Sequence, residues 1–226
     1  MIHDVALQNL PVVFAVDRAG IVGNDGETHQ GIFDLSYLSS IPNMTILSPK
    51  NKWEMADMIR YAVAFEGPVA VRYPRGKAYT GLKEYRKPIR FCESETIYEE
   101  DEIAIFSVGH MMEIAEKARK QLKEMGYNCS LINSRFVKPI DEKILVQMAK
   151  GHKLFVTVEE NVLSGGYGEK VREFVMRQQL PVQVLTLGIP DEYVEHGNID
   201  ILRKEIMLDE DSIVKQIVTQ YVGLER

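Results

Sequence analysis

The sequence lacks the features of several protein classes. It has no uninterrupted apolar run long enough to cross a membrane, and Met1–Asp4 lacks the basic start of a signal peptide. Cysteine is scarce, with only Cys92 and Cys129 in 226 residues, which favours a reducing, cytoplasmic location over a disulfide framework. Acidic residues outnumber basic ones by 33 to 27, so nucleic acid is not expected as a partner. No His, Cys and Asp cluster has metal-ligand spacing, and no metal site is predicted.

The first part of the chain alternates apolar, β-rich runs with amphipathic segments. This pattern is typical of an α/β unit built around a parallel sheet. The predicted strands are residues 12–16, 44–48 and 69–73, and the predicted helices are residues 32–38 and 49–65.

A second α/β unit follows a polar stretch at residues 77–88, which we interpret as a linker. Its predicted strands lie near residues 103–108, 128–133, 154–158 and 182–187. Its predicted helices lie near residues 111–125, 141–150, 168–179, 199–205 and 209–222. The fold class is therefore α/β, with two doubly wound units. Because the first unit begins abruptly and has few strands, we expect a carboxyl-terminal part of a longer polypeptide, with apolar faces that favour self-association.

The most informative segment is a glycine-rich loop at residues 17–31, directly after the first predicted strand. Ligands of open α/β sheets bind just beyond the carboxyl ends of strands. This loop holds Arg18, Asp25 and His29, and Arg75 follows the third predicted strand. Arginine binds phosphate or carboxylate, and histidine transfers protons near neutral pH. The residues therefore predict an anion site with a proton relay.

Each of these residues also has a purely structural interpretation. Arg18 follows Asp17 and could form only a surface ion pair, and Arg75 could simply close a strand. Asp25 precedes a glycine, as in many turns, and His29 could be a solvated loop residue. Their common placement beside one loop makes the functional interpretation the stronger one.

Other conspicuous residues favour structural roles. The run Gly165–Gly168 lacks the spacing of a phosphate loop, and we interpret it as a tight turn that lets a helix pack closely. Glu159 and Glu160 are adjacent on a predicted strand and should face opposite sides, so a shared catalytic site is not expected. For His110 and His196 we expect loop roles or subunit contacts rather than catalysis.

Long motifs in the chain resemble one enzyme family. The segments DRAGIVGNDGETHQGIFDLSYLSSIPNM (residues 17–44), VRYPRG (71–76) and GIPDEYVEHG (188–197) resemble the 1-deoxy-D-xylulose-5-phosphate synthases, which are transketolase-like thiamine diphosphate enzymes. Residues 138–141 and 158–160 are similar to the carboxyl-terminal domain of the wider transketolase group. The resemblance covers essentially the whole chain.

The resemblance implies a domain division and a cofactor. Residues 1–76 would be a truncated pyrimidine-binding domain and residues 89–226 a transketolase carboxyl-terminal domain. The full-length parent would use thiamine diphosphate and Mg²⁺. The family's diphosphate-binding domain and its cofactor-activating glutamate have no counterpart here, so neither group is expected to bind this chain alone. The cofactor-binding residues of this chain are unknown.

The resemblance also implies an activity and residue roles. The family joins pyruvate and glyceraldehyde 3-phosphate with loss of CO₂, and the product feeds isoprenoid, thiamine and pyridoxal biosynthesis. His29 and Asp25 match catalytic positions, His29 as proton donor to the aldehyde oxygen and Asp25 to bind a hydroxyl or orient His29. Arg18 and Arg75 match substrate-binding positions. The resemblance further implies a homodimer, and this chain by itself is expected to be inactive.

Two other interpretations stay open. The chain could be a fragment of a transketolase or of a 2-oxoacid dehydrogenase β subunit, although the Glu195–Gly197 segment and the spacing of Asp25 and His29 argue against both. It could also be a non-catalytic dimerisation or binding module, a possibility that the upstream nucleotide sequence would test.

Overall fold

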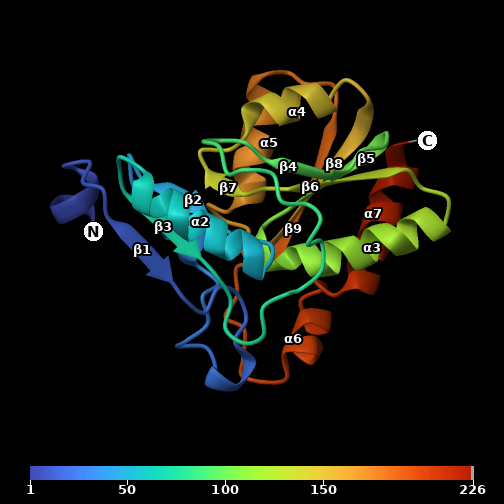
Figure 1. Ribbon diagram of the computed structural model, residues 1–226. Coiled ribbons are helices and arrows are strands. Elements are labelled where there is room, and N and C mark those ends of the chain that lie inside the picture. The colour runs from blue at the N-terminus through green and yellow to red at the C-terminus, as the bar shows by residue number, and fades with distance from the viewer. Residues whose placement is uncertain (225–226) are drawn as a thin grey trace.

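The computed structural model describes residues 1–224 and contains two sheets that lie side by side (Figure 1). The smaller sheet has the strand order β1-β3-β2-β7 and the larger one β4-β6-β5-β8-β9. Helices cover both faces of each sheet, so the α/β, doubly wound fold predicted from the sequence is confirmed. None of the helices within residues 1–224 is both long and apolar enough to cross a membrane.

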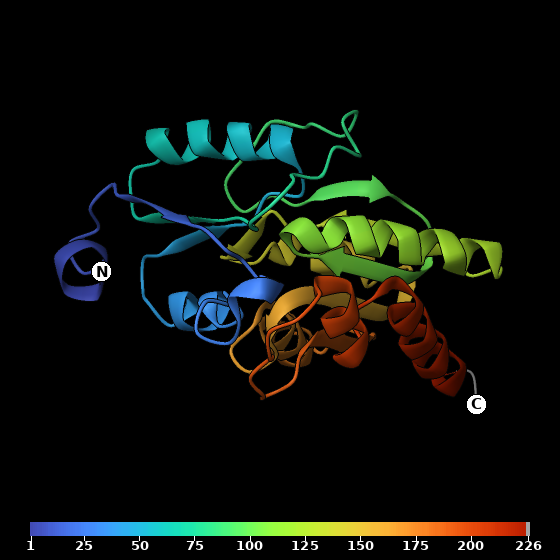
Figure 2. The same cartoon turned by 90° about the horizontal axis from the view of Figure 1, so that it is seen from below.

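The smaller sheet is built mainly from the amino-terminal part of the chain. Its parallel strands are β1 (Val13–Val16), β3 (Val69–Arg72) and β2 (Thr45–Leu47). Side chains alternate between its faces: Ile46 and Ala70 pack in the core that contains α1 (Asp34–Ser39), and Leu47 and Val69 pack in the core that contains α2 (Lys52–Ala64). The two helices therefore lie on opposite sides of the sheet (Figure 2).

The fourth strand of this sheet corrects the sequence prediction. We expected three parallel strands, but β7 (Phe136–Lys138), from the second unit, pairs antiparallel with β2. Phe136 is fully buried and joins the core beneath α2. The second unit thus completes the sheet of the first.

The larger sheet has a parallel centre and an antiparallel edge. Strands β6 (Cys129–Asn133), β5 (Glu102–Ser107), β8 (His152–Val162) and β9 (Gln183–Ile189) run parallel, as predicted. The edge strand β4 (Glu95–Tyr98) pairs antiparallel with β6 and was not predicted.

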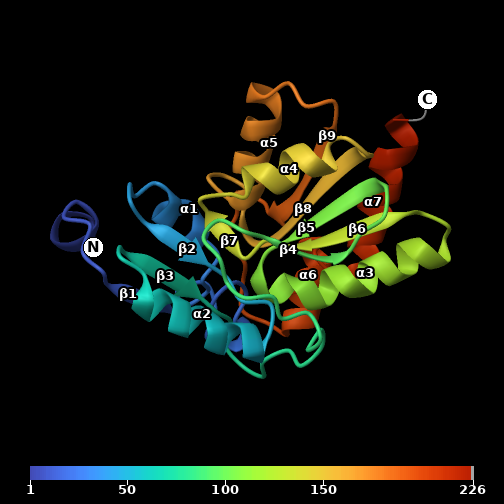
Figure 3. The same ribbon diagram turned by 45° about the horizontal axis from the view of Figure 1, so that its top comes forward.

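Four helices sandwich the larger sheet (Figure 3). One face packs against α3 (Met112–Glu124) and α7 (Glu210–Leu224), and the other against α4 (Glu142–Met148) and α5 (Tyr167–Arg177). The short α6 (Ile199–Glu205) follows β9. Two helix ends show the expected capping. The Asp141 side chain accepts a hydrogen bond from Ile144 N at 3.2 Å at the start of α4, and Gly126 follows α3 with a φ of +92°.

The two units share their cores. Leu35 and Leu38 of α1 pack in the same buried cluster as Phe106 and Phe155 of the larger sheet. Ile21 joins the cluster on the other face of that sheet. Because each unit covers apolar surface of the other, neither presents a separate core.

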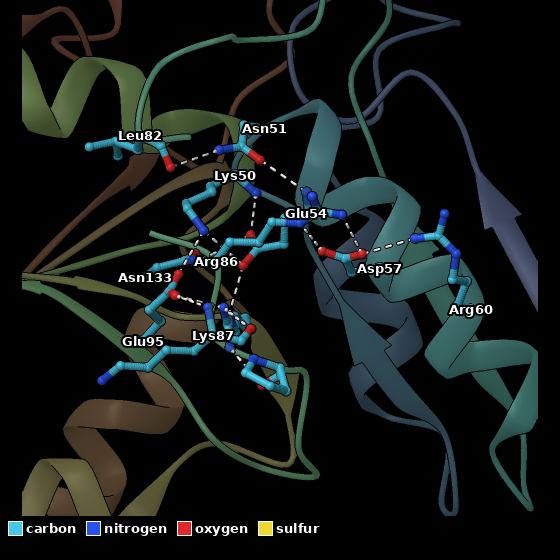
Figure 4. Close-up of polar contacts among 12 residues, drawn as sticks. Lys50, Asn51, Glu54, Asp57, Arg60, Leu82, Arg86, Lys87, Glu95 and Asn133 are labelled. Atoms are coloured by element: carbon cyan, nitrogen blue, oxygen red, sulfur yellow. Dashed lines mark hydrogen bonds and ion pairs between the residues drawn. The ribbon is translucent and has the colours of Figure 1, made fainter. Parts of the chain in front are cut away.

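A buried ion network also joins the units (Figure 4). Lys50 Nζ lies 3.0 Å from Glu54 Oε1 of α2 and 2.6 Å from Glu95 Oε2 of β4. Arg135 Nε lies 2.7 Å from Glu54 Oε1, and Arg135 Nη2 lies 2.9 Å from Glu95 Oε1. All four side chains are at most 2% exposed. Although burial opposes it, Arg135 and Lys50 hold the pKa of Glu95 below its ordinary value.

The stretch at residues 77–88 contains no helix or strand, yet it is fixed to both units. Asn51 donates to Gly81 O at 3.0 Å, Arg86 pairs with Asp57 at 2.6 Å, and Arg135 donates to Lys87 O at 2.9 Å. This segment is therefore an ordered connection between the sheets.

Candidate functional site

The glycine-rich loop at residues 17–31 follows β1, and hydrogen bonds hold its last residue beside its first residues. Gly20 N donates to Gly31 O at 2.9 Å, and Gly31 N donates to Arg18 O at 3.1 Å. Arg18 has a φ of +63°, a backbone conformation that is uncommon for a residue with a side chain. The two ends of the loop are thus joined directly beyond the carboxyl end of β1.

Arg18 and Arg75 converge on the carboxylate of Asp25. Arg18 Nη1 lies 3.4 Å from Asp25 Oδ2, and Arg75 Nη1 donates a hydrogen bond to the same oxygen. That hydrogen bond, with the charges of Arg75, Arg18 and His29, holds the pKa of Asp25 below its ordinary value against the opposing effect of burial. The guanidinium of Arg18 pairs with Asp25 and not with Asp17, whose carboxylate accepts the Arg18 backbone N–H at 2.6 Å.

His29 lies near this trio with an exposed side chain. The hydrogen bond of its ring joins Nδ1 to Thr28 Oγ1 at 2.9 Å. Its charge acts on Asp25 in the same direction as the two arginines. The structure therefore brings Arg18, Arg75 and Asp25 into direct contact and leaves the His29 ring beside them without a direct bond to Asp25.

A cavity of about 950 Å³ lies between the strand ends of the smaller sheet and helices α3 and α6. Arg75 lines it, together with three residues of the second unit that sequence reasoning did not propose as site residues: His110, Glu160 and Arg203. Arg18, Asp25 and His29 lie outside this lining. Arg75 is the residue that joins the predicted anion site to the cavity.

Glu160 contacts both of the other second-unit residues named above, His110 and Arg203, at the edge of the cavity. Its Oε2 accepts from Ile21 N at 2.9 Å and lies 2.7 Å from His110 Nε2, and its Oε1 lies 2.6 Å from Arg203 Nε. The side chain is 1% exposed. Burial opposes ionisation, but the charges of His110 and Arg203 hold the pKa of Glu160 far below its ordinary value.

Glu159 points to the opposite face, as predicted. Its carboxylate accepts hydrogen bonds from Tyr167 N at 2.8 Å and Gly168 N at 2.7 Å, at the start of α5. Burial raises its pKa to about 7, against the lowering by these two N–H groups. The predicted tight packing at the glycine run is also confirmed, because a Cβ on Gly168 would lie 2.5 Å from Thr157 Oγ1.

The residues described do not fit a metal-bound diphosphate. Among residues 1–224, no group of three or more His, Cys, Asp and Glu side chains could hold a metal ion. The arginine–aspartate trio instead carries two cationic groups and one carboxylate, which suits an anionic, hydroxylated ligand.

Comparison with protein families identifies both units. The pyrimidine-binding domain model of transketolase matches residues 1–80, and the transketolase C-terminal domain model matches residues 93–213. The 1-deoxy-D-xylulose-5-phosphate synthases of Lachnoclostridium phytofermentans and Clostridium tetani are 48% and 44% identical over 97% and 96% of this chain. The synthase of Aquifex aeolicus is 44% identical over 96% of it. The chain spans 35% of the length of each of these relatives.

Two solved structures share the fold. A split-gene transketolase, described as an inactive β4 tetramer, has a TM-score of 0.86 and 27% identity over 100% of this chain and 71% of that chain. The transketolase of Campylobacter jejuni has a TM-score of 0.74 and 17% identity over 95% of this chain and 32% of that chain, a likeness of fold alone.

Proposed function

Because this chain belongs to the transketolase family, we propose that it is part of a 1-deoxy-D-xylulose-5-phosphate synthase. Such an enzyme condenses pyruvate and glyceraldehyde 3-phosphate with loss of CO₂. The observation that carries the proposal is the 48% identity with one such synthase over 97% of the chain. Identity with the split-gene transketolase is only 27% over the whole chain, which favours the synthase over a transketolase.

In this proposal, Arg18 and Arg75 bind the phosphate of the aldehyde substrate. Guanidinium groups form paired, charge-assisted hydrogen bonds with phosphate oxygens. The shared carboxylate of Asp25 keeps both groups together before the substrate arrives, which lowers the entropy lost on binding. The trio retains a net charge of +1, the sum of two guanidiniums and one carboxylate, so an anion is still attracted.

The proposed proton chemistry lies with His29 and Asp25. His29, on the same loop, donates a proton to the aldehyde oxygen as it becomes an alkoxide, an effect of roughly 10²–10⁴-fold in other enzymes. Asp25 has acceptor oxygens for a substrate hydroxyl, and the charges of Arg75, Arg18 and His29 all act on its carboxylate. Thiamine diphosphate and Mg²⁺ belong to the proposal for the whole enzyme, with binding groups outside this chain.

The isolated chain is proposed to be inactive and to self-associate. The split-gene transketolase that covers this whole chain is described as an inactive β4 tetramer, which supports both statements. A homodimer of the complete enzyme and a cytoplasmic location are also part of the proposal. The location is supported by the two free thiols, Cys92 and Cys129.

A chimera tests the proposed function. The matched segment of the Lachnoclostridium phytofermentans synthase is replaced by this chain, and the product formed from pyruvate and glyceraldehyde 3-phosphate is identified. The proposal expects 1-deoxy-D-xylulose 5-phosphate from the chimera and none from the isolated chain. A folded chimera that binds thiamine diphosphate but gives no such product, or gives transketolase products instead, would refute it.

A further inference from the structure

We propose that Glu160 is a positioning residue for the glycine-rich loop, so that the second unit sets the geometry of the anion site on the first. The inference deepens the proposed function and rests on it only for the identity of the ligand. Glu160 lies 139 residues from Ile21 in the sequence, and it contacts the glycine-rich loop directly at Ile21 and through Arg72 at Gly31.

The loop is fixed at Ile21 by the Glu160 carboxylate. Ile21 N donates to Oε2 at 2.9 Å in a buried contact. Gly20 has a φ of +74°, and a Cβ at this position would lie 2.0 Å from the same oxygen. The loop therefore approaches the carboxylate as closely as a residue without a side chain permits.

The loop is fixed at Gly31 through the backbone carbonyl of Glu160. Arg72 Nη2 donates to Glu160 O at 2.8 Å and to Gly31 O at 2.7 Å. Arg72 Nε also lies 3.3 Å from Asp34 Oδ2, just beyond the loop. Arg72 is 1% exposed, so this bridge is shielded from water. One residue of β8 thus connects to Ile21 directly and to Gly31 through a single guanidinium.

Glu160 is itself held rigidly. His110 and Arg203 contact its two carboxylate oxygens from two different helical segments that both line the cavity. A carboxylate with a bound donor on each oxygen has little rotational freedom, which makes it an effective anchor. A residue in this position acts through the loop, not on the ligand.

Loss of the Glu160 carboxylate should affect the loop residues of the anion site more than Arg75. Arg18 and Asp25 lie on the loop that donates to the Glu160 carboxylate, whereas Arg75 follows β3, whose Arg72 contacts only the backbone carbonyl of Glu160. Loss of the anchor is therefore expected to shift Arg18 and Asp25 relative to Arg75. Misplacement of a binding group by about 1 Å can lower a rate by roughly 10²-fold.

Hydrogen–deuterium exchange of the isolated chain tests the anchor without any activity. Glu160→Ala is expected to raise the exchange rate of amides in residues 20–31 by about tenfold or more at Ile21 and less towards Gly31, because the buried hydrogen bond to the carboxylate is lost while the backbone carbonyl that Arg72 contacts is kept. Glu159→Ala is the matched control. It removes the adjacent carboxylate on the opposite face and should raise exchange at the start of α5 instead. Equal exchange of residues 20–31 in wild type and Glu160→Ala would overturn the inference.

A second pair of variants covers the case in which Glu160→Ala does not fold. Gly20→Ala and Gly126→Ala both place a side chain at a positive φ, but Gly126 has no atom within 4 Å of its Cβ position. Of the two variants, only Gly20→Ala should raise the amide exchange rate of residues 20–31. Equal exchange of these residues in both variants would also overturn the inference.

In the chimera, Glu160→Ala should raise the KM for glyceraldehyde 3-phosphate by roughly 10–100-fold and change the KM for pyruvate little. A loss confined to kcat, with both KM values unchanged, would contradict positioning. The exchange result does not depend on catalysis. If the folded chimera that binds thiamine diphosphate is inactive, but Glu160→Ala still speeds exchange of residues 20–31 in the isolated chain, the proposed function is refuted and the positioning role stays supported.

Discussion

At the scale of single residues, neighbouring carboxylates have opposite properties because of their surroundings. Glu159 and Glu160 are both buried on β8. Glu160 contacts His110 and Arg203, which lower its pKa against the effect of burial. Glu159 accepts hydrogen bonds from two neutral backbone N–H groups, and burial raises its pKa to about 7. Which face of the strand a residue occupies thus decides its charge near neutral pH.

The raised pKa of Glu159 predicts a pH dependence of stability. The pKa is about 7 in the folded chain against an ordinary 4.5, so the folded state binds more protons between these values. The contribution of this group to stability is full below pH 4.5 and is lost as the pH rises through 7. Glu159→Gln should flatten the decrease in the urea midpoint between pH 5 and pH 8. Glu173→Gln, at an exposed position of α5, should not. Identical slopes in wild type and Glu159→Gln would contradict this prediction.

The residues of the site were only partly predictable. Arg18, Asp25 and Arg75 follow strands of one sheet, and parallel strands end at one edge, so their convergence could be inferred from the order of elements. His110 and Arg203 lie 50 and 43 residues from Glu160 in the sequence. No local pattern relates the three, and only the packing of α6 and of the turn before α3 (Gly109–Met111) beside β8 brings them together.

At the scale of elements, the ion network under α2 is a fully buried polar contact between the units. Removing one partner of a buried ion pair leaves an uncompensated charge. Glu54→Ala should lower the free energy of unfolding by about 3–5 kcal/mol, because Lys50 and Arg135 both lose a partner. Asp57→Ala, on the same helix, removes exposed pairs with Arg60 and Arg86 and should cost about 1 kcal/mol or less. Chemical denaturation checks both, and equal losses would count against the role given to burial.

The elements missed from the sequence share a physical cause. Strand β7 has three residues, too few for a periodic pattern, and it gains its place by pairing with β2 from the other unit. Strand β4 has four residues, among them buried Glu95, whose charge is stabilised by Lys50 and Arg135, two residues outside the strand. Longer apolar segments such as β5 and β8 were recognised because their burial is local to one sheet.

At the scale of the whole molecule, apolar surface remains exposed. Leu7, Val63 and Tyr193 are 71%, 73% and 73% exposed, and β1 is an edge strand of the smaller sheet. Exposed apolar groups and open strand edges favour association with further chains. We predict that the isolated chain forms dimers or larger assemblies at micromolar concentration. Static light scattering measures this directly, and a monomer under these conditions would contradict the prediction.

The proposed anion site requires that Arg18 and Arg75 recognise a phosphate. The most direct measurement compares kcat/KM for glyceraldehyde 3-phosphate and for glyceraldehyde, which lacks the phosphate, in the chimera and in its Arg18→Ala and Arg75→Ala variants. Each substitution should lower the preference for the phosphorylated aldehyde by roughly 10–100-fold, because a charge-assisted contact is lost. Equal losses for both aldehydes would show that the two guanidiniums do not bind the phosphate.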